Sequence, residues 1–227
     1  MVVALDGPSS SGKSTVGAEA ARRLRYRFCD TGLLYRAVAW LAMERSVPAT
    51  DVDALVRLAN EVTLQPDERG RYRQVSAAGR DVTLDVRAEA VDVAVSEYAR
   101  VAELRAQLVD RQRELAATGA IIMAGRDIGT VILPDADVKI YLDASPEERA
   151  RRRTAQRRSQ AGVEERVLAD LRRRDAIDSS RVTAPLRVAE DAVVVHSDGL
   201  DFNQTVRAVL EVIRAADAKR SVGVRHA

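Results

Sequence analysis

A glycine-rich segment near the N-terminus has the residue types and the spacing of a phosphate-binding loop. It fits the pattern G-x-x-x-x-G-K-[ST] without a mismatch and comprises Gly7, Pro8, Ser9, Ser10, Ser11, Gly12, Lys13, Ser14 and Thr15. Its glycines allow the backbone to curl so that successive N–H groups converge on phosphate oxygens. We expect Lys13 to reach the β and γ phosphates of a nucleoside triphosphate, and the Ser14 hydroxyl to ligate Mg²⁺.

The segments on either side of this loop support that interpretation. An apolar run, residues 2–5, precedes the loop and predicts a strand. Residues 15–24 follow it and carry Val16, Ala20 and Leu24 at helical spacing. The loop is therefore expected at the N-terminus of a helix, which is where backbone N–H groups and the helix dipole bind anions.

The rest of the chain predicts strands that alternate with helices. Further short apolar strands are expected at 26–29, 120–124, 138–142 and 192–195, and helices at about 33–41, 98–117, 145–160, from 163 onward and 202–215. Uninterrupted apolar strands suit a parallel sheet that is covered on both faces. We therefore predict an α/β fold, a single domain over residues 1–227, with the phosphate loop after the first strand.

One stretch departs from this alternation. From Glu61 to Asp85 apolar and polar residues alternate, and the run is broken twice, at residues 66–70 and 77–79. This period is typical of a small antiparallel sheet. We expect an inserted module over about residues 60–95.

Composition excludes several classes of protein. No run of eighteen apolar residues occurs, so we expect a soluble, cytoplasmic chain without membrane contacts. The net charge is only +2, from 36 basic and 34 acidic residues, and aromatic residues are few, which argues against nucleic-acid binding. One cysteine and two histidines are too few for a disulfide framework or a structural zinc site.

A phosphate loop alone does not distinguish a kinase from a GTPase or a motor ATPase. A guanine-specific GTPase needs an Asn-Lys-x-Asp motif, and no lysine follows an asparagine in this chain. The segment Asp67–Gly70 spells D-x-x-G, but it follows Gln65-Pro66 instead of an apolar strand and is interpreted as a turn. A small-molecule kinase fits better, because such an enzyme needs arginines for two anionic substrates.

Four further motifs follow the phosphate loop in a fixed order. They are Asp30-Thr31-Gly32-Leu33-Leu34-Tyr35-Arg36, Gly125-Arg126-Asp127-Ile128-Gly129-Thr130-Val131, Lys139-Ile140-Tyr141-Leu142-Asp143-Ala144-Ser145 and Arg174-Asp175-x-x-Asp178-x-x-Arg181. Together they resemble bacterial cytidylate kinases over nearly the whole chain. The resemblance implies a nucleoside-monophosphate kinase core with an enlarged monophosphate-binding insert, and a helical lid over about residues 149–165 that closes over ATP.

The resemblance also implies an activity. It is the transfer of the γ-phosphoryl group of ATP to CMP, and to dCMP, with Mg²⁺ as cofactor and a monomeric chain. The implied CMP site comprises Thr31, Arg36, Ser96, Arg105, Arg126, Asp127, Arg174, Asp178 and Arg181. The implied catalytic residues are Lys13, Arg126, Asp127 and Arg181.

The residue types suit these implied roles. Arg36, Arg126 and Arg181 would grip the CMP phosphate, because a guanidinium fork matches phosphate oxygens. Ser96, Arg105 and Asp127 would read the cytosine edge, since a carboxylate accepts a hydrogen bond from the exocyclic amine that uracil lacks. Arg174 and Asp178 would hold the sugar hydroxyls.

The arginine-rich run from 149 to 158 points in several directions around its helix. Arg153 and Arg157 share a face and are expected to touch the ATP phosphates, whereas the other arginines are expected to be solvated. Asp143, at a predicted strand end, receives no role. Ser14 stands where the family often has glycine, and its hydroxyl suits Mg²⁺.

Two alternatives stay open. The chain could be another small-molecule kinase, with UMP, AMP or a shikimate-type acceptor. It could also be a nucleic-acid-binding ATPase that uses residues 149–187 as a basic patch. Acidic residues interrupt that patch and argue against the second alternative; they are Glu147, Glu148, Glu164, Glu165, Asp170, Asp175 and Asp178.

Overall fold

The structure is a computed structural model, and it describes residues 1–157 and 163–223. Within these residues one sheet of eight strands has the order β3-β4-β2-β6-β1-β7-β8, with β5 paired to β4. The strands are β1 Val2–Asp6, β2 Arg27–Asp30, β3 Val62–Pro66, β4 Arg71–Ala77, β5 Arg80–Asp81, β6 Ile121–Gly125, β7 Val138–Asp143 and β8 Val193–His196. Strands β2, β6, β1, β7 and β8 are parallel, which confirms the predicted α/β fold.

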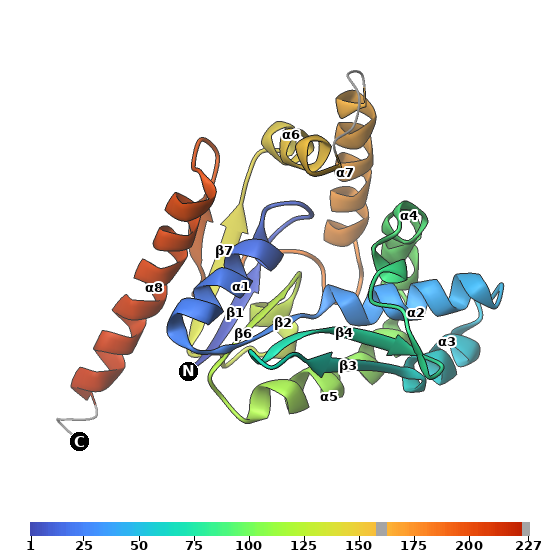
Figure 1. The fold of residues 1–227 in the computed structure, drawn as a ribbon, viewed down its shortest axis with the longest axis horizontal. Helices are drawn as coiled ribbons and strands as arrows, with labels where there is room; N and C mark the ends of the chain where they lie inside the picture. The colour runs from blue at the N-terminus through green and yellow to red at the C-terminus, as the bar shows by residue number, and fades with distance from the viewer. Residues whose placement is uncertain (158–162, 224–227) are drawn as a thin grey trace.

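Helices cover both faces of this sheet (Figure 1). They are α1 Lys13–Leu24, α2 Gly32–Glu44, α3 Val52–Asn60, α4 Glu89–Tyr98, α5 Ala102–Ala117, α6 Pro146–Arg157, α7 Glu164–Ser179 and α8 Phe202–Gly223. Two short helical turns, η1 Asp85–Arg87 and η2 Ile128–Ile132, lie between them. Helices α6 and α7 stand above the end of β7, and α4 lies beside α7 (Figure 1).

The central strand β1 shows why apolar runs form this sheet. Val3, Ala4 and Leu5 are all fully buried. Because successive side chains of a strand point to opposite faces, Val3 and Leu5 pack against α1 and α8, whereas Ala4 packs on the other face with α5 and η2. Strand β1 is therefore buried on both faces, and the phosphate loop begins at its carboxyl end.

The alternating stretch predicted at Glu61–Asp85 forms β3, β4 and β5. Strand β3 pairs with β4 in antiparallel fashion, with Val62 opposite Ala77, as the alternation predicted. Strand β4 also pairs in parallel with β2, through Phe28 and Arg71. The hairpin is therefore continuous with the central sheet.

Two helices differ from the prediction. The helix predicted from Tyr98 begins at Ala102, and a separate helix, α4, ends at Tyr98. No glycine or proline marks the break. The chain turns at Val101, which has extended backbone, and Arg105 donates a hydrogen bond of 3.1 Å to the carbonyl of Ala99 there. A side-chain hydrogen bond to a carbonyl six residues earlier thus stabilises a break that no glycine or proline marks.

The start of α6 agrees with its predicted capping residues. Pro146 begins α6, and the Ser145 hydroxyl accepts a hydrogen bond from the N–H of Glu148, as predicted. The end predicted near residue 160 and part of the expected lid lie outside the described residues. Helix α8 continues to Gly223, beyond its predicted end at 215.

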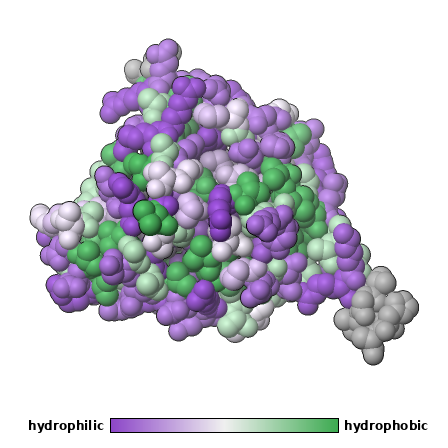
Figure 2. All heavy atoms as spheres, turned by 180° about the vertical axis from the view of Figure 1, so that it is seen from behind, coloured by the Kyte–Doolittle hydropathy of each residue, from purple (hydrophilic) through white to green (hydrophobic). Residues whose placement is uncertain are grey.

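The surface is polar. None of the described helices has the length and apolar character needed to cross a membrane. Seen from behind, hydrophilic side chains cover much of the molecule and apolar ones form separate groups between them (Figure 2). Surface arginines pair with nearby acids, as Arg22 does with Glu19 and Arg45 with Glu61. Charge at these places is locally balanced, in contrast to the cleft described next.

Candidate active site

The phosphate loop connects β1 to α1 and depends on its two glycines. Gly7 has a φ of +148°, and a Cβ there would lie 2.2 Å from the carbonyl oxygen of Leu142 in β7. Gly12 has a φ of +99° and leads directly into α1. Only glycine adopts the first conformation and fits the close approach, so the loop is held against β7 at the N-terminus of a helix.

Lys13 lies inside this loop. Its side chain is buried, and Nζ donates hydrogen bonds to the Pro8 carbonyl at 2.6 Å and to the Ser11 hydroxyl at 3.3 Å. Burial, and after it the positive charge of Arg126, lowers the pKa of Lys13 well below its usual value. Lys13 and Arg126 line the same cleft, so two cations face one space. An anion between the two would relieve their repulsion.

The Ser14 hydroxyl donates a 2.5 Å hydrogen bond to Oδ2 of Asp30 at the end of β2. Both side chains line the same cleft as Lys13. Among the described residues no group of three or more histidine, cysteine or acidic side chains could hold a metal. A hydroxyl with a neighbouring carboxylate nevertheless fits Mg²⁺, which prefers oxygen ligands and keeps waters and phosphates in its shell. Asp30 received no role from the sequence, although it begins the 30–36 motif.

One cleft, of about 630 Å³, brings together residues predicted for the donor site and for the acceptor site. Six loop residues line it: Ser9, Ser10, Gly12, Lys13, Ser14 and Thr15. All nine residues predicted for the acceptor site also line it: Thr31, Arg36, Ser96, Arg105, Arg126, Asp127, Arg174, Asp178 and Arg181. Gly7, Pro8 and Ser11 shape the loop but do not line the cleft. Residues from five helices, α1, α2, α4, α5 and α7, and from the loops after β1, β2, β6 and α7 thus converge on one space.

The cleft is strongly cationic. Ten basic and four acidic residues line it, although the whole chain has a net charge of only +2. The Nε atoms of Arg105, Arg174 and Arg181 are buried and have no hydrogen-bond partner within the described part of the chain. Burial, and then the charges of Arg126 and Arg36, lowers the pKa of Arg174 to about 9. Such crowding of cations favours an anionic ligand.

Arg105 and Asp127 form a buried pair. Their side chains are 3% and 6% exposed, and Nη2 of Arg105 lies 2.5 Å from Oδ2 of Asp127. The Arg105 guanidinium also lies 5.1 Å from the centre of the Tyr35 ring. The pair therefore presents a carboxylate acceptor and guanidinium donors side by side in a fixed orientation.

Asp178 joins the remaining acceptor residues. Its carboxylate accepts hydrogen bonds from Nε of Arg126 at 2.9 Å, from Ser96 Oγ at 3.4 Å and from Arg181. Burial opposes its ionisation, but Arg126 and Arg181 together lower its pKa. Thr31 is held separately, by a 3.0 Å hydrogen bond to the carbonyl of Ala124. An ionised Asp178 thus orients two arginines into the cleft.

Asp92 on α4 is a residue that the sequence did not single out. It is buried, pairs with Arg36 and with Arg153, and lies 3.7 Å from Arg174. Arg153, predicted to touch ATP phosphates, thereby contacts the acceptor side of the cleft. The side chain of Arg157, the second predicted lid residue, lies outside the described part of the structure. The position of Asp92 at the cleft could have been predicted only from correct bounds for α4, which the sequence pattern did not predict.

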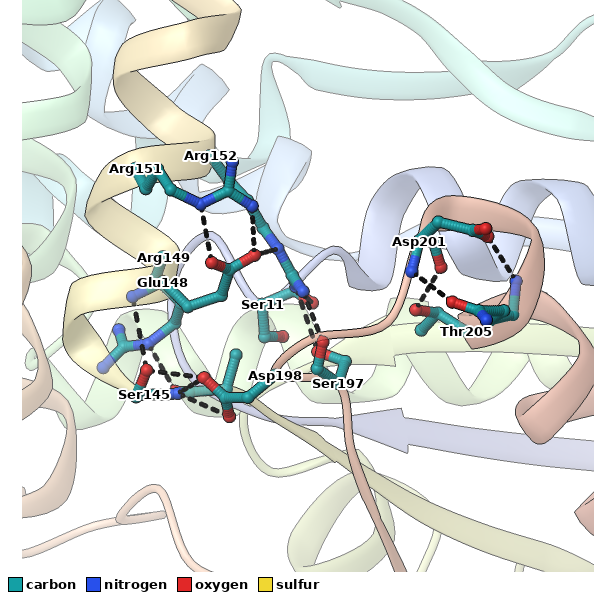
Figure 3. A network of polar contacts seen from close by, with 12 residues as sticks. Ser11, Ser145, Glu148, Arg149, Arg151, Arg152, Ser197, Asp198, Asp201 and Thr205 are labelled. Atoms are coloured by element: carbon teal, nitrogen blue, oxygen red, sulfur yellow. Dashed lines mark hydrogen bonds and ion pairs between the residues drawn. The ribbon is translucent and has the colours of Figure 1, made fainter.

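The prediction that the other arginines of this run are solvated is wrong for two of them. Arg149 is 3% exposed and donates to the Ser9 carbonyl at 3.1 Å and to Asp175 at 2.6 Å. Arg152 donates to the Ser11 carbonyl at 3.4 Å and to Ser197. Figure 3 shows the Arg152 side chain extending from α6 toward Ser11 of the phosphate loop and Ser197 after β8, with Arg149 beside Ser145. Helical position alone could not show that the loop passes under α6.

We expect Arg149→Ala to lower the free energy of unfolding by about 3 kcal/mol, because it leaves Asp175 and the Ser9 carbonyl without their buried partner. The KM for ATP should rise as well, since the loop loses a tether. Urea unfolding and initial rates measure both effects. Arg151→Ala is the matched control: Arg151 lies on the same helix, is 64% exposed and pairs with Glu148. Equal unfolding midpoints for the two variants would contradict the tether.

Fold and site together define a class. A parallel sheet whose first strand leads into a phosphate loop, and whose surrounding helices and loops bring a second set of arginines to the same cleft, is the arrangement of a phosphate-loop kinase with a small anionic acceptor.

Comparison with known proteins identifies the family. The family model for cytidylate kinase matches residues 3–215. A cytidylate kinase of Geobacillus sp. (strain WCH70) is 42% identical, over 93% of this chain and 95% of its own length. A cytidylate kinase of Mycolicibacterium paratuberculosis is 43% identical, over 94% and 95%. The chain belongs to the cytidylate kinase family.

Solved structures agree with the fold. A structure of an uncharacterized protein from Eubacterium ventriosum superposes with a TM-score of 0.52, covering 94% of this chain and 98% of that one. The two sequences are 10% identical, so this likeness concerns the fold alone.

Proposed function

We propose that this chain transfers the γ-phosphoryl group of ATP to CMP, giving ADP and CDP, and that dCMP is a second acceptor. The observation that carries the proposal is the single cationic cleft, lined both by the phosphate loop and by all nine residues predicted for the CMP site. Membership of the cytidylate kinase family supports the choice of acceptor.

The donor side would bind ATP through the phosphate loop. Its backbone N–H groups and the N-terminus of α1 cradle the phosphates, while Lys13 turns from the Pro8 carbonyl to the β and γ phosphates. Mg²⁺ would be held by the Ser14 hydroxyl with Asp30 beside it, and would supply charge neutralisation at those phosphates. Arg149 and Arg152 keep the loop against α6 while the nucleotide is bound.

The acceptor phosphate would bind Arg36, Arg126 and Arg181. A CMP phosphate oxygen is ionised at neutral pH, so it attacks without a general base and catalysis rests on positioning and charge neutralisation. Lys13 and Arg126 line the same cleft, and the charge of Arg126 contributes to lowering the pKa of Lys13, so phosphates bound between them would relieve this repulsion. Each of the four proposed catalytic residues, Lys13, Arg126, Asp127 and Arg181, then serves binding and orientation.

Base recognition would come from the buried pair Arg105 and Asp127. The Asp127 carboxylate accepts from the exocyclic amine of cytosine, and Arg105 donates to the ring acceptors. A uracil carbonyl at the same place would face a carboxylate and lose a hydrogen bond. Arg174 and Asp178 line the α7 side of the cleft and would hold the sugar, while Ser96 on α4, which donates to Asp178, would join the pair at the cytosine edge.

The remaining architecture fits an enzyme that closes over two substrates. We propose residues 149–165 as the lid and residues 60–95 as the acceptor-side module, with the chain acting as a monomer. The contact of Arg153 with Asp92 connects α6 with α4 across the cleft. Closure would exclude water from the transferring phosphoryl group.

An acceptor panel tests the proposal. ADP release is measured with ATP and Mg²⁺ in the presence of CMP, dCMP, UMP, AMP or shikimate. We expect the highest kcat/KM with CMP and ready use of dCMP. A higher kcat/KM with UMP, AMP or shikimate would show that this compound, and not CMP, is the acceptor. ADP release that depends on RNA or DNA, with no acceptor used, would overturn the kinase assignment.

A further inference from the structure

The segment that carries Arg126 and Asp127 continues into η2, a short helical turn with an unusual cap. Asp127 occupies the N-cap position of η2. An aspartate there normally accepts hydrogen bonds from the first free N–H groups of the helix. The Asp127 side chain makes no such bond and instead pairs with Arg105 at 2.5 Å. The first N–H groups of η2 therefore need another acceptor.

Asp6 is that acceptor. Its Oδ1 accepts from the N–H of Ile128 at 2.8 Å, and its Oδ2 accepts from the N–H of Gly129 at 2.7 Å. Asp6 is the last residue of β1 and lies directly opposite Gly125 of β6 in the sheet. The register of the sheet thus places the Asp6 carboxylate beside the start of η2. Asp6 itself is the residue immediately before the phosphate loop.

The arrangement is tightly packed. Asp6 is 5% exposed, and burial raises its pKa to about 6. A Cβ at position 129 would lie 3.4 Å from Oδ2 of Asp6 and 3.1 Å from Cδ of Lys139, so a glycine allows this close approach. A buried carboxylate is costly unless both oxygens are hydrogen-bonded, and here both are.

We propose that Asp6 is a positioning residue for base recognition. By capping η2 in place of Asp127, it leaves the Asp127 carboxylate directed at Arg105 and available to the cytosine amine. The same contact ties the Arg126–Asp127 segment to the strand that leads into the donor loop. This inference rests on the proposed role of Asp127 as the reader of cytosine.

The variant Asp6→Asn tests it. An asparagine offers one acceptor oxygen for two N–H groups, so Asp127 is free to turn back and cap its own helix. We expect the ratio of kcat/KM for CMP to that for UMP to fall about tenfold, which corresponds to about 1.4 kcal/mol. The dissociation constant for ATP with Mg²⁺, measured by calorimetry, should stay within about twofold of the wild type.

Asp137→Asn is the matched control. Asp137 also accepts a backbone N–H, that of Val2 at 2.7 Å, but at the opposite end of β1. In the Asp137→Asn enzyme, the ratio of kcat/KM for CMP to that for UMP should equal the wild-type ratio. Adding Asp6→Asn to Asp127→Asn should leave the ratio of the single Asp127 variant unchanged, because Asp6 acts through Asp127. An unchanged ratio in Asp6→Asn, or a further fall in the double variant, would overturn the proposal.

A second test uses the wild-type protein, so it does not depend on whether a variant folds. Long-range NMR couplings across hydrogen bonds should connect the amide nitrogens of Ile128 and Gly129 to the carboxyl carbon of Asp6. Couplings to the carboxyl carbon of Asp127 instead would overturn the proposed cap. A wild-type enzyme that does not prefer CMP to UMP would refute the proposed function, and these couplings would still test the cap separately.

Discussion

Lys13→Ala is expected to lower kcat by about 10³-fold, at the lower end of the loss seen when a charge that stabilises a transferring phosphoryl group is removed. Lys13 is buried, is held at 2.6 Å by the Pro8 carbonyl and lies under the influence of Arg126. No other lysine lines the cleft. The loss should therefore fall mainly on kcat, since loop N–H groups still bind the α and β phosphates.

Initial rates at saturating ATP and CMP measure this loss. Lys219→Ala is the control, because Lys219 is an exposed lysine of α8 outside the cleft. Circular dichroism should show the same helix content in both variants. A Lys13→Ala enzyme with wild-type turnover would refute the assignment of the phosphate loop as the donor site.

Asp127→Ala should be nearly as damaging, but for the acceptor instead of the donor. It removes the acceptor for the cytosine amine, and kcat/KM for CMP should fall by about 10²-fold, the loss of a charged hydrogen bond of up to about 3 kcal/mol. Binding of ATP should change little, because the Asp127 carboxylate contacts Arg105 and not the phosphate loop. Calorimetric titration with ATP and Mg²⁺ separates the two effects.

The alanine variant also leaves Arg105 buried without its carboxylate, which destabilises a fold by about 3–5 kcal/mol. Asp127→Asn keeps the shape and one acceptor oxygen, and its amide can also donate to uracil. We expect this variant to fold and to narrow the preference for CMP over UMP. An Asp127→Asn enzyme with the wild-type ratio of kcat/KM values would show that another group reads the base.

Sequence patterns predicted the parts of this fold that depend on neighbouring residues. The phosphate loop follows from its glycines, the central strands from apolar runs, and the start of α6 from Ser145 and Pro146. The acceptor residues were predicted from motifs that resemble a family, and the structure places all nine in one cleft. Their proposed roles in binding remain predictions.

Contacts between distant segments could not be predicted. Nothing in the run from 149 to 158 distinguishes buried Arg149 from exposed Arg151, since burial depends on where the phosphate loop passes. The position of Asp92 at the cleft depends on the break between α4 and α5, and the Arg105 side chain that stabilises this break is itself held by Asp127, 22 residues away. Asp6 looks like an ordinary strand end until the sheet places β6 beside it. Each of these groups is charged and buried, so its role is set by a partner elsewhere in the chain.

The central claim is that one cleft holds ATP opposite CMP. The most direct measurement is a single reaction of the wild-type enzyme with ATP, Mg²⁺ and equal concentrations of CMP, UMP and AMP, followed by phosphorus NMR and separation of the products. We expect CDP and ADP to form first and in equal amounts, while UMP and AMP persist. ADP formed with inorganic phosphate and no CDP, or UDP formed ahead of CDP, would contradict it.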